Sequence, residues 1–287
     1  MCIVESFLAK MKISVIIPTW NRAHTLGKAI QSVLAQTVPV WEILVCDDGS
    51  TDDSQKLVQG INDKRVFWLA GPHGGLPALP RNRGLSVAQG DWIAFLDSDD
   101  EWLPTKLEKQ LEALQQTGAR ALCCNAYRVQ SQNQENTELF FFQAISRLTT
   151  LDELLGTNPV ICSSTLIHRS VLTVAGPFPE SPGLKAIEDY ALWLRVACLT
   201  PFYFIEEPLL SYHDNPEESV RQEDVDPLEQ RLRILQDVSQ WATRNKRQVP
   251  STARHNIKRA LNKALGRPDP EVWLTTKRFV RSLLTRL

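Results

Sequence analysis

Short apolar runs alternate with helix-like segments through the first 117 residues, and this alternation restricts the chain to few architectures. Runs typical of buried strands cover residues 12–21, 41–50, 65–70 and 91–97. Segments with helix signals cover residues 25–37, 51–61 and 105–118. This order predicts an α/β fold with a Rossmann-like, mostly parallel sheet covered by helices on both faces. Between the third and fourth strands, a loop rich in glycine and proline is expected over residues 71–84.

The remaining chain is less regular, and its character changes near Pro216. It is predicted to contain a strand at residues 121–129, a helix at 186–199, and a final pair of strands at 202–207 and 209–214. After that pair, the sequence is polar, charged and helical. We therefore expect three parts: an N-terminal extension (1–10), an α/β domain (11–215) and a helical, basic C-terminal segment (216–287).

The charges divide unevenly between the body and the tail. Residues 241–287 hold 12 Lys or Arg and 2 Asp or Glu, whereas residues 1–240 hold 20 Lys or Arg and 31 Asp or Glu. Residues 271–287 are predicted to form an amphipathic helix. Such a helix can make peripheral contact with an anionic membrane, or it can pack on the acidic body or in a homodimer, and these alternatives stay open. Because the body is acidic and lacks a known nucleic-acid recognition motif, nucleic acid is not expected as a partner.

The cysteines and the apolar runs indicate in which cellular compartment the protein is expected. The six cysteines show no Cys-x-x-Cys spacing, so reduced thiols in the core are expected rather than a zinc site or disulfides. No apolar run reaches the roughly 18 residues that a membrane span needs. The leader, residues 1–10, does not have the pattern of a signal peptide. We expect a cytoplasmic protein, at the inner face of the membrane if the tail binds there.

The fourth predicted strand ends in four carboxylates within residues 97–101. In an extended segment, residues two apart point the same way, so Asp97 and Asp99 can converge on one ligand. Two carboxylates suit Mg²⁺ or Mn²⁺, which complete their coordination with phosphate and water. Such an ion would offset the repulsion and hold a diphosphate. A solvated acidic loop explains the spacing equally well at this stage.

A second acidic cluster, Asp47-Asp48-Gly49-Ser50, lies in the turn that ends the second predicted strand. A carboxylate at this position can accept a hydrogen bond from a nucleobase or a ribose hydroxyl. Turn formation alone also favours such a sequence. Both clusters fall at the carboxyl ends of predicted parallel strands, where sheets of this kind place their ligand clefts. The coincidence indicates a binding site.

Five ordered segments together resemble the inverting glycosyltransferases of family 2, which have the GT-A fold. They are SVIIPTWNR, EILVCDDGSTDDS, PRNRGL, GDWIAFLDSDDEWLP and IEDYALWLRVA. The resemblance covers residues 13–213 in order and spacing. It implies metal-dependent transfer of a sugar from a nucleotide diphosphate sugar, usually a UDP-sugar, to a hydroxyl of a glycan or lipid-linked acceptor.

The resemblance also implies which residues bind the donor. Thr19, Asn21 and Arg22 match the turn that lines the nucleotide pocket of the family. Asp48 matches the aspartate that accepts from the base, and Arg81 matches an arginine near the donor phosphates. The resemblance assigns no role to two further residues. Trp20 is expected in the core, and His73 is expected in a structural or surface position.

The same resemblance implies the metal site and the catalytic base. Asp97 would face the ribose, with Ser98 beside it in the donor site, and Asp99 would hold Mn²⁺ or Mg²⁺. Asp189 matches the base that takes the proton from the attacking hydroxyl, although a helix N-terminus also favours an acid there. His213 departs from the family pattern by one or two positions, so a metal ligand and a surface histidine are both open.

Two other functions compete with glycosyl transfer. A sugar-1-phosphate nucleotidyltransferase shares the broad topology but would need a glycine-rich, basic signature near the first strand, which PTWNR lacks. A non-catalytic sugar-nucleotide-binding protein on the same fold is the other alternative. The sequence does not identify the sugar, the acceptor or the linkage.

Overall fold

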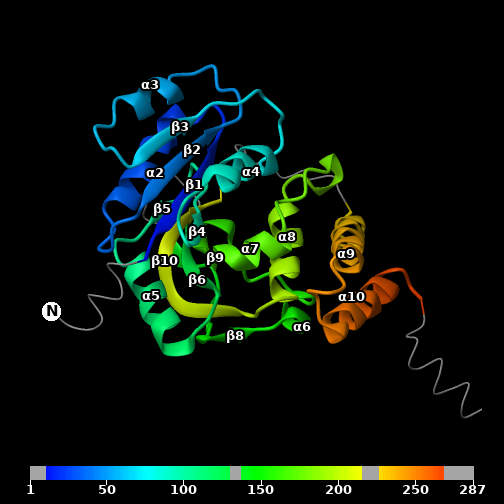
Figure 1. Cartoon of the computed structure of the whole chain (residues 1–287). Coiled ribbons are helices and arrows are strands. Elements are labelled where there is room, and N and C mark those ends of the chain that lie inside the picture. Colours follow the sequence, from blue (N-terminus) through cyan, green and yellow to red (C-terminus); the bar gives the residue numbers. More distant parts are fainter. Residues whose placement is uncertain (1–10, 130–136, 215–225, 268–287) are drawn as a thin grey trace, which may run out of the picture.

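Four parallel strands form the amino-terminal half of the central sheet in the computed structural model (Figure 1). In spatial order they are β3 (Val66–Leu69), β2 (Glu42–Asp47), β1 (Ile13–Thr19) and β4 (Trp92–Phe95). Each neighbouring pair is parallel. Every residue of β1, β2 and β4 is buried, because helices cover both faces of the sheet. The structure describes residues 11–129, 137–214 and 226–267.

The second half of the sheet is mixed. Next to β4 lie β9 (Leu166–His168), β6 (Ala121–Val129), β10 (Phe202–His213) and β5 (Glu101–Trp102), in that order. Only β6 and β10 pair in parallel, and β9 and β5 run antiparallel to their neighbours. Two short strands, β7 (Thr137–Leu139) and β8 (Arg147–Thr149), pair antiparallel with β6 and β10. The predicted α/β fold is confirmed, with its parallel strands concentrated in the first half.

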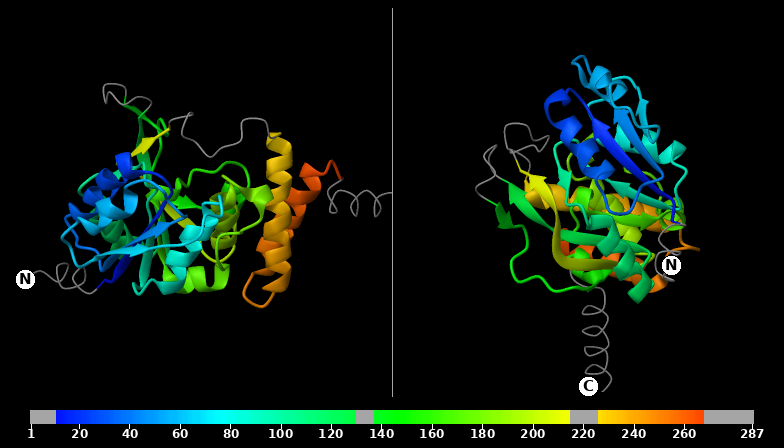
Figure 2. Two further views of the ribbon diagram at one scale, coloured as in Figure 1. Left: turned by 90° about the horizontal axis from the view of Figure 1, so that it is seen from above. Right: turned by 90° about the vertical axis from the view of Figure 1, so that its left-hand side faces the viewer.

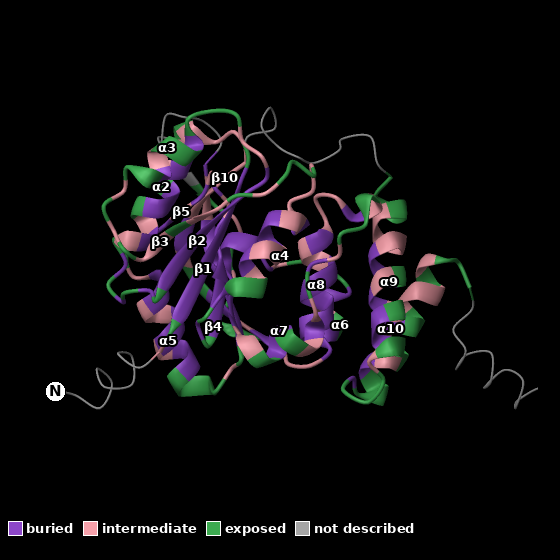
Figure 3. Ribbon diagram, turned by 45° about the horizontal axis from the view of Figure 1, so that its top comes forward, coloured by how far each residue is buried: buried purple, intermediate pink, exposed green. Residues whose placement is uncertain are grey.

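Two apolar layers flank the sheet, as the buried residues in Figure 3 show. One layer contains α2 (Ala23–Leu34), α3 (Ser54–Gln59) and α5 (Lys106–Thr117), packed through residues such as Ile30 and Leu111. The other contains α4 (Ala78–Val87), α7 (Arg169–Ala175) and α8 (Glu188–Ala197). The shorter elements are α6 (Leu151–Leu154) and the 3-10 turns η1 (Cys162–Ser164) and η2 (Pro182–Leu184).

Helix α4 corrects the prediction of a loop over residues 71–84. The helix begins at Ala78, inside the stretch rich in glycine and proline. Pro80 occupies the first turn, where backbone N–H groups have no acceptor within the helix, so proline is tolerated. Gly84 lies directly on the sheet, since a Cβ there would approach Cys46 Sγ to 2.6 Å. The residues that suggested a loop instead let a helix start and pack closely.

Strand β10 corrects the prediction of two final strands. A single strand runs from Phe202 to His213, and Pro208 lies within it. The pairing with β6 shifts register on both sides of Pro208, which accommodates a residue that cannot donate to the ladder. The long strand therefore carries His213 to the same end of the sheet as the carboxyl ends of β1 and β2.

Two helices, α9 (Pro227–Arg244) and α10 (Ser251–Ala264), follow the sheet and lie at the end of the molecule opposite β3 (Figure 2). Helix α9 packs on α8, where Arg195 donates to Asp237 Oδ2 at 2.6 Å. Within the described residues, no helix combines the length and apolar character that crossing a bilayer requires. The extension 1–10 and the predicted amphipathic helix 271–287 lie outside the described residues.

Candidate active site

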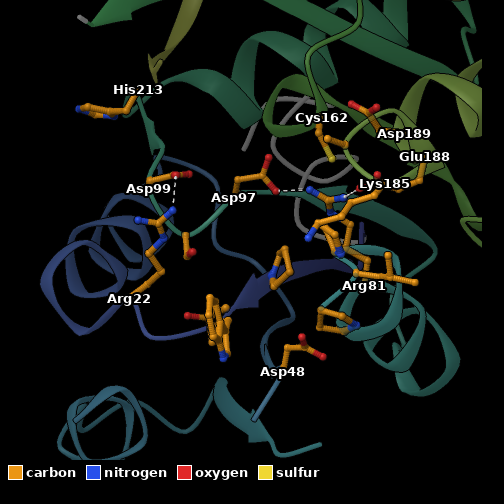
Figure 4. Close-up of a pocket in the computed structure, with 18 of the residues that line it drawn as sticks. Arg22, Asp48, Arg81, Asp97, Asp99, Cys162, Lys185, Glu188, Asp189 and His213 are labelled. Atoms are coloured by element: carbon orange, nitrogen blue, oxygen red, sulfur yellow. Dashed lines mark hydrogen bonds and ion pairs between the residues drawn. The ribbon is translucent and has the colours of Figure 1, made fainter. Parts of the chain in front are cut away.

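A pocket of about 690 Å³ opens where β1, β2 and β4 end (Figure 4). It brings together residues that lie as far apart in the sequence as Thr19 and His213. All ten residues singled out from the sequence line this pocket: Thr19, Asn21, Arg22, Asp48, Arg81, Asp97, Ser98, Asp99, Asp189 and His213. Their placement in one pocket is consistent with a shared ligand and leaves their individual roles to be tested.

The two aspartates after β2 do different things. Asp47 closes the turn, because its carboxylate accepts from the backbone N–H of Gly49 at 3.1 Å and of Ser50 at 3.0 Å. Asp48 lines the pocket and accepts from the N–H groups of Gly74 at 3.0 Å and Gly75 at 2.9 Å. The turn explanation therefore applies to Asp47, and Asp48 is the residue of this cluster that lines the pocket.

The turn after β1 forms another wall of the pocket. Asn21 adopts a left-handed conformation with φ of 51°, and its Oδ1 accepts from the N–H of Thr51 at 2.8 Å. Asn21 therefore ties the turn after β1 to the turn after β2. Thr19 Oγ1 is buried and has no hydrogen-bond partner among the described residues, which leaves it available to a ligand.

Trp20 corrects an expectation from the sequence, whereas His73 is exposed, in agreement with its expected structural or surface position. Trp20 is 48% exposed instead of lying in the core, and its ring stacks on His73 with centroids 4.6 Å apart. Both residues line the pocket, and His73 Nδ1 lies 3.1 Å from Asp48 Oδ2. No local signal predicted this pair, because the loop that carries His73 meets β1 only in the folded chain.

Ser163 holds the acidic loop after β4. Its Oγ accepts from the N–H of Asp97 at 3.0 Å and donates to the carboxylate of Asp100. Asp100 in turn accepts from the backbone N–H of His213 at 2.9 Å. Burial, with smaller contributions from Asp99 and Asp97, raises the pKa of Asp100 well above its ordinary value. Asp100 is thus a buried link between this loop and β10.

Arg81 lies between two carboxylates on opposite sides of the pocket. Its Nη1 donates to Glu188 Oε1 and its Nη2 to Asp97 Oδ1, each at 2.6 Å. Arg81 and Glu188 are both buried. Glu188 was not singled out from the sequence, and its position beside Asp189 was the only signal that could have drawn attention to it. The guanidinium connects the acidic loop after β4 to the start of α8.

Asp189 occupies the first turn of α8 and faces the pocket. Burial, followed by repulsion from Glu188, raises the pKa of Asp189 to about 7, although Arg81 acts in the opposite direction. Its Oδ1 accepts from the N–H of Tyr190 at 2.7 Å. A carboxyl group with this pKa can accept a proton near neutral pH, as a general base must.

The carboxylates near β4 fit a divalent cation together with a ligand. Among the described residues, no three His, Cys, Asp or Glu side chains form a ready metal site. Asp97 and Asp99 nevertheless line the pocket beside the buried Asp100, and Mg²⁺ and Mn²⁺ commonly use one or two carboxylates plus phosphate and water. Burial lowers the pKa of His213, which favours the neutral imidazole that can bind metal. Figure 4 places His213 on the Asp99 side, away from Asp189.

Comparison with known families identifies the chain. The model described as "Glycosyl transferase family 2" matches residues 14–173, which is more than half of the sequence. The chain belongs to glycosyltransferase family 2. This family membership confirms the resemblance noted in the sequence and the glycosyltransferase activity that it implied. The matches support neither a nucleotidyltransferase nor a non-catalytic binding protein.

Relatives of this family 2 chain include two proteins from Escherichia coli. WfgD is a UDP-Glc:alpha-D-GlcNAc-diphosphoundecaprenol beta-1,3-glucosyltransferase, 34% identical over 64% of this chain and 69% of its own length. WfaP bears the same enzyme name and is 30% identical over 64% of this chain and 69% of its own. The chain thus spans about two thirds of each relative.

Solved structures agree on the fold of this glycosyltransferase. The structure of S. aureus TarS 1–349 in complex with UDP-GlcNAc superposes with a TM-score of 0.71 over 89% of this chain and 72% of TarS. The sequences are 19% identical, so the likeness establishes the fold alone. The predicted GT-A fold is therefore confirmed.

Proposed function

We propose that this family 2 glycosyltransferase moves a sugar from a UDP-sugar to a hydroxyl group of a lipid-linked glycan, with inversion and with a divalent metal. The observation that carries the proposal is that Asp48, Asp99 and Asp189 line one and the same pocket. These carboxylates supply, in one cavity, groups suited to a nucleoside, a metal-bound diphosphate and an acceptor hydroxyl. Figure 4 shows Asp48, Asp99 and Asp189 on different sides of that cavity.

The donor assignment rests on the geometry around β1 and β2. Asp48 lies beside the exposed ring of Trp20 and the buried Thr19 Oγ1, so acceptors and an aromatic face are available to a base and its ribose. The TarS structures with the same fold were solved with UDP and UDP-GlcNAc, which supports a uridine nucleotide. UDP-glucose is the first donor to test, because the names of both Escherichia coli relatives specify it.

The acceptor assignment rests on the relatives. Both act on GlcNAc linked through a diphosphate to undecaprenol, as their names state. An acceptor of this class would bring the enzyme to the inner face of the membrane, in keeping with the basic C-terminal segment. We therefore propose a cytoplasmic enzyme that meets the membrane at its surface.

In the proposed mechanism, Asp189 takes the proton from the acceptor hydroxyl while the oxygen attacks the anomeric carbon of the donor. The base and the donor-binding carboxylates line opposite parts of the pocket, which suits attack from the face opposite the departing diphosphate and hence inversion. Arg81 orients this arrangement through its hydrogen bonds to Asp97 and Glu188. Asp189 lies next to Glu188 at the start of α8, so these contacts also position the base.

Asp99 would hold the divalent metal, with His213 as a further ligand and the donor diphosphate completing the shell. When bound, Mn²⁺ or Mg²⁺ supplies Lewis-acid stabilisation of the negative charge on the departing UDP. Asp97 adds negative charge beside Asp99, and Ser163 fixes the loop that carries them through its hydrogen bonds to Asp97 and to the buried Asp100. Arg22, whose Nη2 lies 3.8 Å from Asp99, adds positive charge on the donor side.

The decisive experiment compares donor binding and turnover in Asp189→Asn. We expect calorimetry to show similar binding of UDP with Mn²⁺ to the wild type and the variant, because Asp189 lies away from the donor site. Transfer from UDP-glucose to a GlcNAc-diphosphate lipid should fall by at least about a thousandfold without the base. Asp53→Asn, at the exposed position just before α3, is the matched control and should retain full activity.

Three results would contradict the proposal. Absence of heat with UDP and Mn²⁺ would exclude the donor site, and unchanged turnover in Asp189→Asn would exclude the base. Full activity after chelation of divalent ions with EDTA would exclude the metal. A panel of UDP, GDP and dTDP in the same calorimeter would show whether uridine is the preferred base.

A further inference from the structure

Lys185 differs from the other long basic side chains that line the pocket. Arg22 lies 3.8 Å from Asp99, and Arg81 is held between two carboxylates. Within residues 11–129, 137–214 and 226–267, the ammonium group of Lys185 makes no ion pair with a carboxylate. Figure 4 shows its side chain beside Arg81 and close to the start of α8. An unpaired cation in a pocket is suited to an anionic group of a ligand.

The backbone around Lys185 holds it in this position. The N–H of Lys185 donates to Pro182 O at 3.3 Å, which closes the η2 turn, and Leu184 beside it is buried. Ala186 adopts a left-handed conformation with φ of 65°, which is costly for a residue other than glycine. From α9, Arg233 Nη1 donates to Gly183 O at 3.2 Å. Helix α9 thus supports the loop that carries Lys185.

The position of Lys185 relative to the proposed base indicates which anion it meets. Both Lys185 and Asp189 line the pocket, and Figure 4 shows them on the same side of it, away from Asp99 and His213. Lys185 therefore lies on the side where the acceptor hydroxyl must bind. In an acceptor of the proposed class, the reacting hydroxyl and the diphosphate are attached to one sugar ring. A cation that binds this diphosphate must therefore lie within about one sugar ring of the base.

Resting on the proposed function, we propose that Lys185 binds the diphosphate of the lipid-linked acceptor and thereby selects acceptors whose sugar is attached directly to it. The sugar of the acceptor then lies between Lys185 and Asp189, with its reacting hydroxyl toward the carboxylate of Asp189. The uridine nucleotide binds on the other side of the pocket, near Asp48 and Asp99. Lys185 is a specificity residue in this arrangement.

The test measures binding of two synthetic acceptors to the full chain saturated with UDP and Mn²⁺. One is GlcNAc α-diphosphate with a short alkyl chain, and the other is the alkyl α-glycoside of GlcNAc without phosphate. We expect the wild type to bind the diphosphate compound at least about tenfold more tightly, as one charge-assisted contact provides. Lys185→Gln should abolish this preference, Lys185→Arg should keep most of it, and the exposed control Lys56→Gln on α3 should keep all of it.

The outcomes separate failure of this inference from failure of the proposed function. If Lys185→Gln retains the preference for the diphosphate compound, Lys185 does not bind it and the inference is wrong. If Lys185→Gln instead weakens binding of UDP itself about tenfold, Lys185 belongs to the donor diphosphate, which also overturns the inference. If the wild type binds UDP but neither acceptor, the proposed acceptor class is wrong, and this inference falls with it.

Discussion

Arg81 of α4 donates to Glu188 of α8 at 2.6 Å, although 107 positions separate the two residues in the sequence. Both side chains are buried, and the same guanidinium also donates to Asp97. A single cation therefore joins the acidic loop after β4 to the helix that carries the proposed base.

Arg81→Gln should destabilise the protein. Removing the guanidinium leaves Glu188 as a buried carboxylate without its cation, and breaking one side of a buried pair costs about 3 kcal/mol or more. Urea unfolding should show this loss in the free energy of unfolding. Arg65→Gln is the matched control, because among the described residues Arg65 pairs only with the nearby Asp63, at a partly exposed site. This substitution should cost less than about 1 kcal/mol. Equal losses in the two variants would show that Arg81 has no special structural role.

The raised pKa of Asp189 predicts a pH-dependent activity. Because the proposed base acts as a carboxylate, kcat/KM should rise about tenfold per pH unit at low pH and level off above about 7. A pH–rate profile with saturating Mn²⁺ measures this. A profile that levels off near the ordinary carboxyl pKa of 3.8 would contradict the assignment.

The raised pKa of Asp189 also predicts a pH-dependent stability, which should fall as the pH rises, whereas activity should increase. Since the pKa of Asp189 is higher in the folded state, its protonated form contributes stability that is complete below pH 3.8 and is lost as the pH rises through about 7. The free energy of unfolding of the wild type, relative to that of Asp189→Asn, should therefore fall between about pH 4 and pH 7. Urea titrations at several pH values measure the difference. A difference that is independent of pH would contradict the shift.

Ser163→Ala should disturb the acidic loop, and Ser164→Ala should not. Ser163 Oγ bonds both Asp97 and Asp100, whereas Ser164 Oγ donates only to Ile161 O at 2.7 Å. Both serines are buried, so the pair isolates the effect of the contacts. Ser163→Ala should weaken binding of UDP with Mn²⁺ about tenfold, since the buried partners lose about 1–3 kcal/mol of hydrogen bonding. Calorimetry measures this, and equal affinities in the two variants would contradict the prediction.

Two glycines within helices should respond oppositely to alanine. In Gly84→Ala, the new Cβ would lie 2.6 Å from Cys46 Sγ and 2.8 Å from Ile16 Cγ2, so α4 must shift on the sheet at a cost of about 1–3 kcal/mol. In Gly27→Ala, the nearest atom is Leu57 Cδ1 at 3.5 Å, and the better helix propensity should add up to about 1 kcal/mol. Thermal and urea unfolding would show whether each variant is more or less stable than the wild type. A stable Gly84→Ala variant would show that α4 does not need its close contact with β1 and β2.

The sequence by itself determined the strands that frame the pocket and many of the residues that line it. Residues 12–21, 41–50 and 91–97 are apolar runs that end in polar or acidic turns, and the structure contains β1, β2 and β4 there. Parallel strands present their carboxyl ends at one edge, so the residues that follow these runs were expected to meet. This reasoning needs only local patterns and the connectivity of an α/β sheet.

Only the tertiary structure decided which side chains contact one another inside the pocket. The pairing of Arg81 with Glu188, the two bonds of Ser163 and the stacking of Trp20 on His73 all join segments far apart in the chain. Tertiary packing also turned an expected loop into α4 and two expected strands into β10. Periodicity and propensity describe neighbours along the chain, whereas these contacts depend on how helices and strands pack. The sequence therefore indicated where a site lies, and the packing determined how its charges are paired.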